Sequence, residues 1–268
     1  MAASATETAQ TKTIAYGTDS LQDLDFTRAR GVSGPAPLIV FVHGGGWKRG
    51  SKDNATGRYK AAHFTNEGYA FTTINYRLVP DATVEQQAQD VADALAALLA
   101  RAKDLGIAPG KVVLMGHSAG AHLVALVGTD PQYLHRAGLS YAAIAGVVPI
   151  DGAAYDVPRQ IVQGGRFMHA TYVQAFGEDA ARQRALSPTV HAPAPNATAF
   201  LLLHVQREDG IAQARELETA LRKAGTQVER REFAGRGLRG HAEINRELGN
   251  PDYPATAVVD AWLRRILR

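Results

Sequence analysis

The sequence predicts an α/β protein with a mostly parallel, doubly wound sheet of about eight strands. Several short apolar runs lack strict alternation, as is typical of strands covered by helices on both faces, and they lie at 38–43, 70–75, 111–115, 144–150 and 199–205. Helical patterns separate these runs, which favours parallel strands joined by crossover helices. A chain of 268 residues with 46% hydrophobic content can bury one substantial core, so we expect one domain over residues 1–268.

The flanking elements follow from the spacing of apolar residues. Weak alternation between Lys12 and Arg30 predicts an antiparallel edge pair at the start of the sheet. Residues 83–102 repeat apolar side chains every three to four positions, which predicts an amphipathic crossover helix. After the last apolar run we expect a helix from Ile211 to Lys223, a strand over 227–233 and a closing helix from Ala255 to Leu267.

Residues 152–198 lack this alternation of strand-like and helix-like segments. The segment contains Gly164-Gly165, several prolines and scattered aromatic residues, and it lies where an excursion over the strand ends would sit. We predict a small lid and call residues 152–198 the lid segment. Its Tyr155 and Phe167 are candidate substrate-pocket residues, with packing in the lid's own small core as the alternative.

Composition excludes several classes of function. The formal charge is only +3 and the basic residues are scattered, so no nucleic-acid partner is predicted. No apolar run approaches the length of a membrane span, and residues 1–20 do not resemble a secretory signal, so we expect a soluble protein, cytoplasmic rather than secreted. The absence of cysteine excludes disulfides and thiolate metal sites. The oligomeric state is left open.

Two motifs carry the chemistry. Ser118 is the centre of Gly116-His117-Ser118-Ala119-Gly120, between a buried strand and a helix-like segment. A strand that reverses into a helix within one residue forces the serine into a strained conformation and exposes its hydroxyl above the sheet. The second motif, His43-Gly44-Gly45-Gly46-Trp47, directly follows the strand-like run Leu38–Val42.

With both motifs in place, the chain resembles the α/β-hydrolase superfamily, and the esterase and kynurenine formamidase group within it. The resemblance implies an α/β-hydrolase fold from about residue 35 to the C-terminus, with Ser118 as the nucleophile. It also implies an oxyanion hole made by the backbone amides of Gly45, Gly46 and Ala119. Trp47 is a candidate wall of the substrate pocket, or an anchor for the loop.

The order of catalytic residues in that superfamily is serine, acid, histidine. His241 is the predicted general base, because it lies in a glycine-rich loop expected after the strand at 227–233. The acid is expected after the strand at 199–205, where Asp209 is our prediction and Glu208 the alternative. Val205 stands where related sequences usually have glycine. Either carboxylate could instead stabilise the start of the helix that follows.

The predicted function is a serine carboxylesterase that hydrolyses small to medium esters through an acyl-enzyme on Ser118. Its partner is a small-molecule ester, and no metal or organic cofactor is expected, since the remaining histidines lack a carboxylate pattern for a metal site. The alternatives are an arylformamidase, which would use the same nucleophile and oxyanion hole, and a catalytically inactive ligand-binding protein on the same fold.

Overall fold

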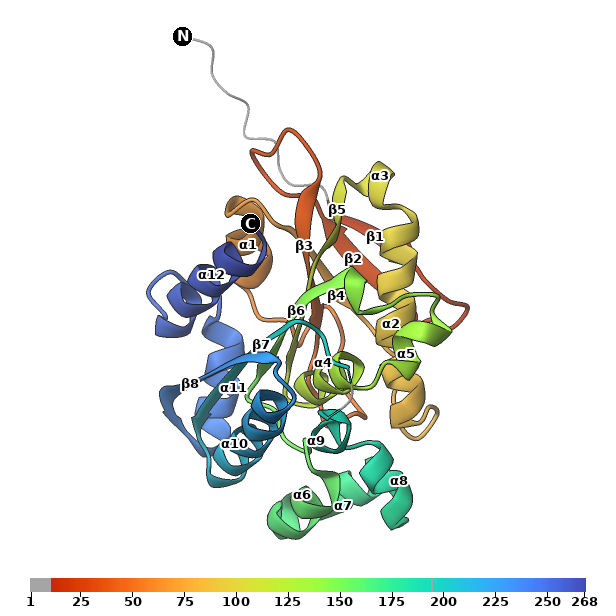
Figure 1. Cartoon of the computed structure of the whole chain (residues 1–268), viewed down its shortest axis with the longest axis vertical. Coiled ribbons are helices and arrows are strands. Elements are labelled where there is room, and N and C mark those ends of the chain that lie inside the picture. Colours follow the sequence, from red (N-terminus) through yellow and green to blue (C-terminus); the bar gives the residue numbers. More distant parts are fainter. Residues whose placement is uncertain (1–10, 194) are drawn as a thin grey trace.

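An eight-stranded sheet forms the centre of the molecule (Figure 1), as seen in a computed structural model that describes residues 11–193 and 195–268. The strands are β1 (Thr11–Ala15), β2 (Asp23–Thr27), β3 (Ala36–Val42), β4 (Ala70–Ile74), β5 (Ile107–His117), β6 (Ile144–Ile150), β7 (Ala199–Gln206) and β8 (Gln227–Arg236). Their order is β1-β2-β4-β3-β5-β6-β7-β8. The β1–β2 and β2–β4 pairs are antiparallel and the remaining pairs are parallel. The predicted fold class is confirmed.

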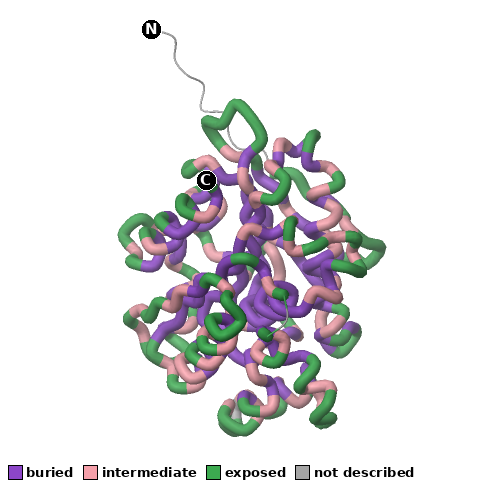
Figure 2. The backbone as a smooth tube through the Cα atoms, viewed as in Figure 1, coloured by how far each residue is buried: buried purple, intermediate pink, exposed green. Residues whose placement is uncertain are grey.

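Helices cover both faces of the sheet, so each central strand buries both sets of its alternating side chains. In β3, Leu38, Val40 and Val42 face one core, while Ile39 and Phe41 face the other. The first core includes α2 (Val84–Ala100), α4 (Ala119–Thr129), α5 (Gln132–Arg136) and α10 (Glu208–Lys223), and the second includes α1 (Lys60–Asn66), α11 (Gly237–Glu247) and α12 (Pro254–Ile266). Figure 2 shows the buried backbone concentrated in this central region.

The lid segment is helical rather than irregular. It contains α6 (Val157–Gln163), α7 (Gly165–Phe176), α8 (Ala180–Ala185) and α9 (Pro188–His191), of which α6, α7 and α8 lie at the bottom of Figure 1. Asp156 and Asp179 cap α6 and α8 by accepting hydrogen bonds from backbone amides three residues ahead. Helices α6 and α7 end at Gly164 and Gly177, and α9 begins at Pro188. These helices are short and are separated by glycine and proline, so the sequence of the segment resembles an irregular one.

Most sequence-based elements are present within one to four residues of their predicted bounds. The helix predicted over 83–102 begins after Thr83, whose side chain forms a capping box with Gln86. The chain also forms a short helix α3 (Ala102–Leu105) and a 3₁₀ turn at Tyr141–Ala143. Among the described residues, no helix combines the length and apolarity needed to cross a bilayer.

The stretch after the last strand was expected to be a loop, and that expectation is wrong. Strand β8 continues to Arg236, and α11 begins at the next residue. Gly235 and Gly237 adopt φ values of 125° and 52°, so the chain turns from strand to helix within a few residues. The glycines therefore make a sharp corner that places α11 across the carboxyl end of the sheet.

Candidate active site

Ser118 occupies the strained turn that its motif predicts. It is the single residue between β5 and α4, and its backbone has φ 57° and ψ −117°. A positive φ is uncommon for a residue with a side chain, and here the neighbouring backbone enforces it. A Cβ on Gly120 would lie 2.1 Å from the carbonyl oxygen of Val42, and one on Gly116 would lie 2.3 Å from that of Gly120. Both positions therefore require glycine.

His241 lies within hydrogen-bond distance of this serine. Its Nε2 is 3.0 Å from Ser118 Oγ. His241 belongs to the first half of α11, and the ring of His117, on β5, lies 4.5 Å from its own ring. The Nε2–H of His117 donates a 2.9 Å hydrogen bond to the backbone carbonyl of His241. His117, next to Ser118, thus holds α11 against the end of β5.

The carboxylate that binds His241 is Asp151, so the prediction of Asp209 is wrong. Asp151 directly follows β6, and its Oδ2 lies 2.5 Å from His241 Nδ1. A carboxylate only accepts hydrogen bonds, so Nδ1 carries the proton and Nε2 is free to accept one from Ser118. Asp151 Oδ1 accepts a second hydrogen bond, of 3.0 Å, from the amide of Val205.

Asp209 and Glu208 have other environments. Asp209 Oδ2 accepts a 3.0 Å hydrogen bond from Gln160 and lies 3.5 Å from Arg207 Nη1. Glu208 is exposed and is the first residue of α10. The sequence did contain a signal for Asp151, since this residue directly follows a buried parallel strand beside the strand that leads to Ser118, and ligands and catalytic groups gather at that edge of a parallel sheet.

Asp151 is a fully buried carboxylate, with 0% of its side chain exposed. Burial by itself would raise its pKa, but the hydrogen bond from His241 and the charge of Arg207 outweigh burial and lower the pKa to about 2. Asp151 is therefore ionised at neutral pH. Burial, followed by the charge of His241, lowers the pKa of His117 well below its usual value, so His117 is neutral and keeps its role as a single hydrogen-bond donor to the backbone.

A cavity of about 730 Å³ opens onto Ser118 and His241. The predicted oxyanion residues Gly45, Gly46 and Ala119 line it. Gly45 has φ 137°, and a Cβ there would lie 1.8 Å from the carbonyl oxygen of Arg49, so glycine is needed for the loop to close. Further walls come from the lid segment and from α11, namely Ala153, Met168, Thr171, Tyr172, Leu238, Ala242 and Asn245.

The predicted pocket residues have three different outcomes. Trp47 both lines the cavity and anchors its loop, because only 3% of it is exposed and its ring packs against Tyr172 and Phe176. Tyr155, at the start of the lid segment, does not line the cavity, since it is buried in the first core with 2% exposure, so that prediction is wrong. The side chain of Phe167 lies outside the described part of the structure.

The remaining motif histidine, His43, is structural. Its Nδ1 lies 2.8 Å from the carbonyl oxygen of Gly44, and its ring stacks on Tyr76 with 4.3 Å between centroids. Burial lowers its pKa to about 4, consistent with a neutral ring at neutral pH. His43 therefore supports the backbone of residues 43–47, which we call the glycine loop.

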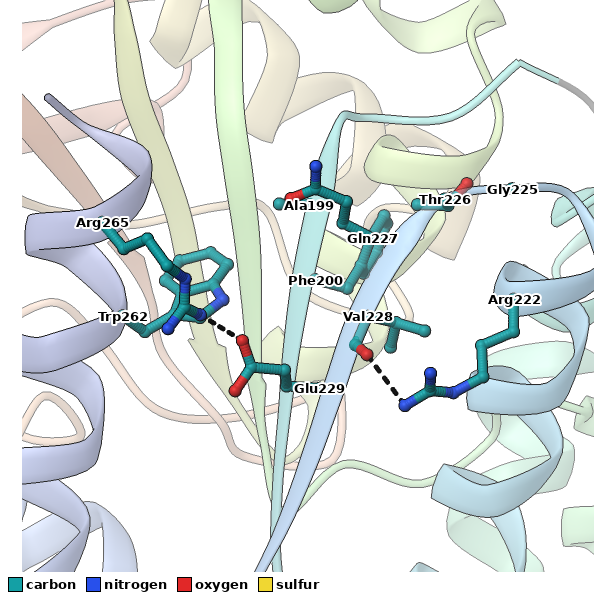
Figure 3. Close-up of a pocket in the computed structure, with 10 residues that line it drawn as sticks. All are labelled: Ala199, Phe200, Arg222, Gly225, Thr226, Gln227, Val228, Glu229, Trp262 and Arg265. Carbon is teal, nitrogen blue, oxygen red and sulfur yellow. Dashed lines mark hydrogen bonds and ion pairs between the residues drawn. The ribbon is translucent and has the colours of Figure 1, made fainter.

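A second cavity of about 470 Å³ lies at the opposite end of the sheet, at the amino ends of β7 and β8 (Figure 3). Its two arginines are already engaged: Arg265 pairs with Glu229, and Arg222 donates to the carbonyl oxygen of Val228. Catalytic groups in parallel sheets gather at the carboxyl ends of the strands, so this cavity is not the candidate site. Within residues 11–193 and 195–268, no cluster of three metal-binding side chains occurs.

Solved structures share this architecture. Esterase B from Lactobacillus rhamnosis aligns with a TM-score of 0.77 and 21% identity over 97% of this chain and 85% of that one. Esterase 2 from Thermogutta terrifontis, in a structure phosphoramylated by tabun, aligns with a TM-score of 0.74 and 21% identity over 96% and 94%. The chain has the α/β-hydrolase fold.

Sequence comparisons of this α/β-hydrolase chain agree with the structures. The BD-FAE family model matches residues 24–143, which include the HGGGW and GHSAG motifs. Esterase LipC of Mycobacterium tuberculosis is 31% identical over 243 residues, 84% of this chain and 58% of LipC. Esterase LipQ of the same organism is 28% identical over 231 residues, 81% of this chain and 54% of LipQ. The chain thus spans a little over half the length of these two relatives.

Proposed function

We propose that this protein is a serine carboxylesterase that hydrolyses small to medium esters. The observation that carries the proposal is the hydrogen-bonded series Ser118, His241 and Asp151 at the wall of a cavity. Serine needs a base to become nucleophilic and a third group to orient that base, and this series supplies both. The esterase names of LipC and LipQ, and the esterase structures with the same fold, support ester hydrolysis.

The mechanism follows from the proton positions. His241 Nε2 takes the proton of Ser118 as Oγ attacks the ester carbonyl, and Asp151 stabilises the imidazolium through Nδ1. The tetrahedral intermediate collapses when His241 gives its proton to the leaving alcohol. Water then enters, His241 deprotonates it, and attack on the acyl-enzyme releases the acid and restores Ser118.

Negative charge on the carbonyl oxygen needs hydrogen-bond donors. The proposed donors are the amides of Gly45, Gly46 and Ala119, which lie around the same cavity as Ser118. Ala119 begins α4, an eleven-residue helix whose amino end faces the nucleophile. The partial positive charge of that end favours the oxyanion. Each well-aimed amide is worth about 3 kcal/mol in the transition state.

The first test removes the nucleophile. Ser118→Ala should lower kcat/KM for p-nitrophenyl acetate by about 10⁶ and abolish labelling by a fluorophosphonate probe, because no other hydroxyl has a base beside it in the cavity as described. A panel of p-nitrophenyl esters of increasing chain length, set beside N-formylkynurenine, compares ester with formamide hydrolysis. Retained labelling in Ser118→Ala would overturn the proposal.

The second test decides between the two aspartates. Asp151→Asn should lower kcat by about 10⁴, because the amide can no longer hold the imidazole in the required tautomer. Asp209→Asn is the matched control and should lower kcat less than about tenfold, since Asp209 does not contact the imidazole. The ratio of the two kcat values, measured per labelled active site, is the readout. A larger loss in Asp209→Asn would restore the original sequence-based assignment.

A further inference from the structure

Arg207 lies between two carboxylates at the edge of the proposed active site. Its Nε is 3.3 Å from Asp151 Oδ2, and its Nη1 is 3.5 Å from Asp209 Oδ2. Its Nη2 donates a 3.4 Å hydrogen bond to the carbonyl oxygen of Gly152. The side chain is 15% exposed and lines the cavity of Ser118. The guanidinium therefore has one edge on the proposed catalytic acid and another on Asp209.

Asp151 needs a nearby cation. It is a buried anion, and a buried charge without a compensating cation is strongly unfavourable. Among the described residues, Arg207 is the one lysine or arginine with an ion pair to Asp151. The contact acts by charge, since Arg207 Nε is within ion-pair distance of the carboxylate yet makes no hydrogen bond in the described part of the chain.

Asp209 is in turn held from the lid segment. Gln160 on α6 donates through Nε2 to Asp209 Oδ2 at 3.0 Å and to the hydroxyl of Tyr172 at 3.1 Å. Tyr172 lies on α7 and lines the cavity. A continuous polar series thus runs from the cavity wall through Gln160, Asp209 and Arg207 to Asp151.

We propose that Arg207 is a positioning residue of the esterase reaction, which holds Asp151 against His241 while Asp209 holds the guanidinium in place. The inference rests on the proposed function. Because Arg207 acts through the Asp151 carboxylate, its effect depends on that carboxylate being present. An arginine that binds substrate, or one that only stabilises the fold, has no such dependence.

A double-mutant cycle tests this dependence. Arg207→Gln should lower kcat for p-nitrophenyl acetate about tenfold, change KM less than about threefold, and be rescued to within about threefold by Arg207→Lys. In an Asp151→Asn background, Arg207→Gln should change kcat less than about twofold, because the charge it positions is already absent. Rates are normalised to the fraction of protein that a fluorophosphonate labels, so loss of folded protein does not count as loss of catalysis.

Arg182 provides the matched control. It lies on α8 of the lid segment and, like Arg207, pairs with a carboxylate, in this case Glu85 at 2.8 Å. It does not line the cavity, so Arg182→Gln should keep full kcat. An equal loss from Arg207→Gln in both Asp151 backgrounds, or a rise in KM with unchanged kcat, would overturn the inference. Activity that survives Ser118→Ala would instead overturn the proposed function, so the two failures are distinguishable.

Discussion

At the scale of the residue, hydrogen-bond partners fix the protonation of buried histidines. The Nε1–H of Trp47 donates a 3.3 Å hydrogen bond to His122 Nδ1, and His122 Nε2 donates a 2.8 Å bond to the carbonyl oxygen of Leu186. A second proton on the ring would face the indole N–H. Burial lowers the pKa of His122 to about 4, so the neutral ring is the form that joins the glycine loop to the lid segment.

This arrangement predicts acid sensitivity. The pKa of His122 is about 6.5 in the unfolded chain and about 4 in the fold, so the unfolded state binds more protons between these values. Stability is thus fully present above pH 6.5 and falls as the pH approaches 4, with a contribution from His122 of about 3 kcal/mol. His122→Gln should flatten this slope in urea unfolding measured from pH 7 to 4.5. The exposed His135, changed to Gln, is the control and should leave the slope unchanged.

At the scale of the element, the junction of β5 with α4 depends on backbone contact between neighbouring elements. The start of α4 approaches the end of β3 so closely that there is no room for a side chain at Gly120. Main-chain atoms cannot move aside as a flexible side chain would. The position of Ser118 is therefore set by the contact of a helix with a strand, in addition to the local turn.

Gly120→Ala should consequently destabilise the protein by about 3 kcal/mol or more, because the added methyl group would meet the carbonyl oxygens of Val42 and His43. Gly34→Ala is the matched control, since a Cβ there meets nothing within 4 Å, and it should change stability by less than about 0.5 kcal/mol. Urea denaturation midpoints measure both. Equal midpoints for the two variants would contradict this account of the junction.

Sequence patterns predicted the elements better than they predicted the partners of side chains. Ser118 and the strands carry local signals, namely a motif and apolar runs, and these were sufficient to place them. The partner of His241 depends on which strand ends lie side by side, and Asp151 and Asp209 both follow buried strands. Which aspartate contacts His241 depends on two other hydrogen bonds. The amide of Val205 holds Asp151 beside His241, and the side chain of Gln160 holds Asp209 away from it. Neither contact has a signature in the spacing of residues.

At the scale of the whole molecule, a buried lysine connects three distant segments. Lys60 on α1 donates to the carbonyl oxygen of Thr56 at 2.7 Å and to both oxygens of Asn245 on α11, the helix that carries His241. Its Nζ also lies 4.9 Å from the centre of the Phe41 ring. Burial lowers its pKa to about 7. The penalty for burying the ammonium is then offset by carbonyl acceptors rather than by an ion pair.

The pH dependence of the free energy of unfolding should reveal the cost of burying the Lys60 ammonium. Between pH 7 and 10.5 the unfolded state holds more protons on Lys60 than the fold does, so this residue makes stability rise with pH over that interval. The free energy of unfolding of Lys60→Met minus that of the unchanged protein should therefore fall by about 3 kcal/mol between pH 7 and 9.5. Lys223→Met, at an exposed position on α10, is the control and should give a constant difference. A constant difference for Lys60→Met as well would disprove the linkage.

The pairing of β5 with β6 has a consequence for engineering. His117 and Ile150 are partners in the sheet, so Ser118 and Asp151 each stand one step beyond a bonded pair, and the amide of Ser118 donates to the carbonyl oxygen of Ile150. The distance between Ser118 and Asp151 is therefore set by the pairing of β5 with β6 and not by residues 152–198. Exchanging that segment for a foreign one would change walls of the cavity while leaving Ser118 and Asp151 on the same unaltered pair of strands.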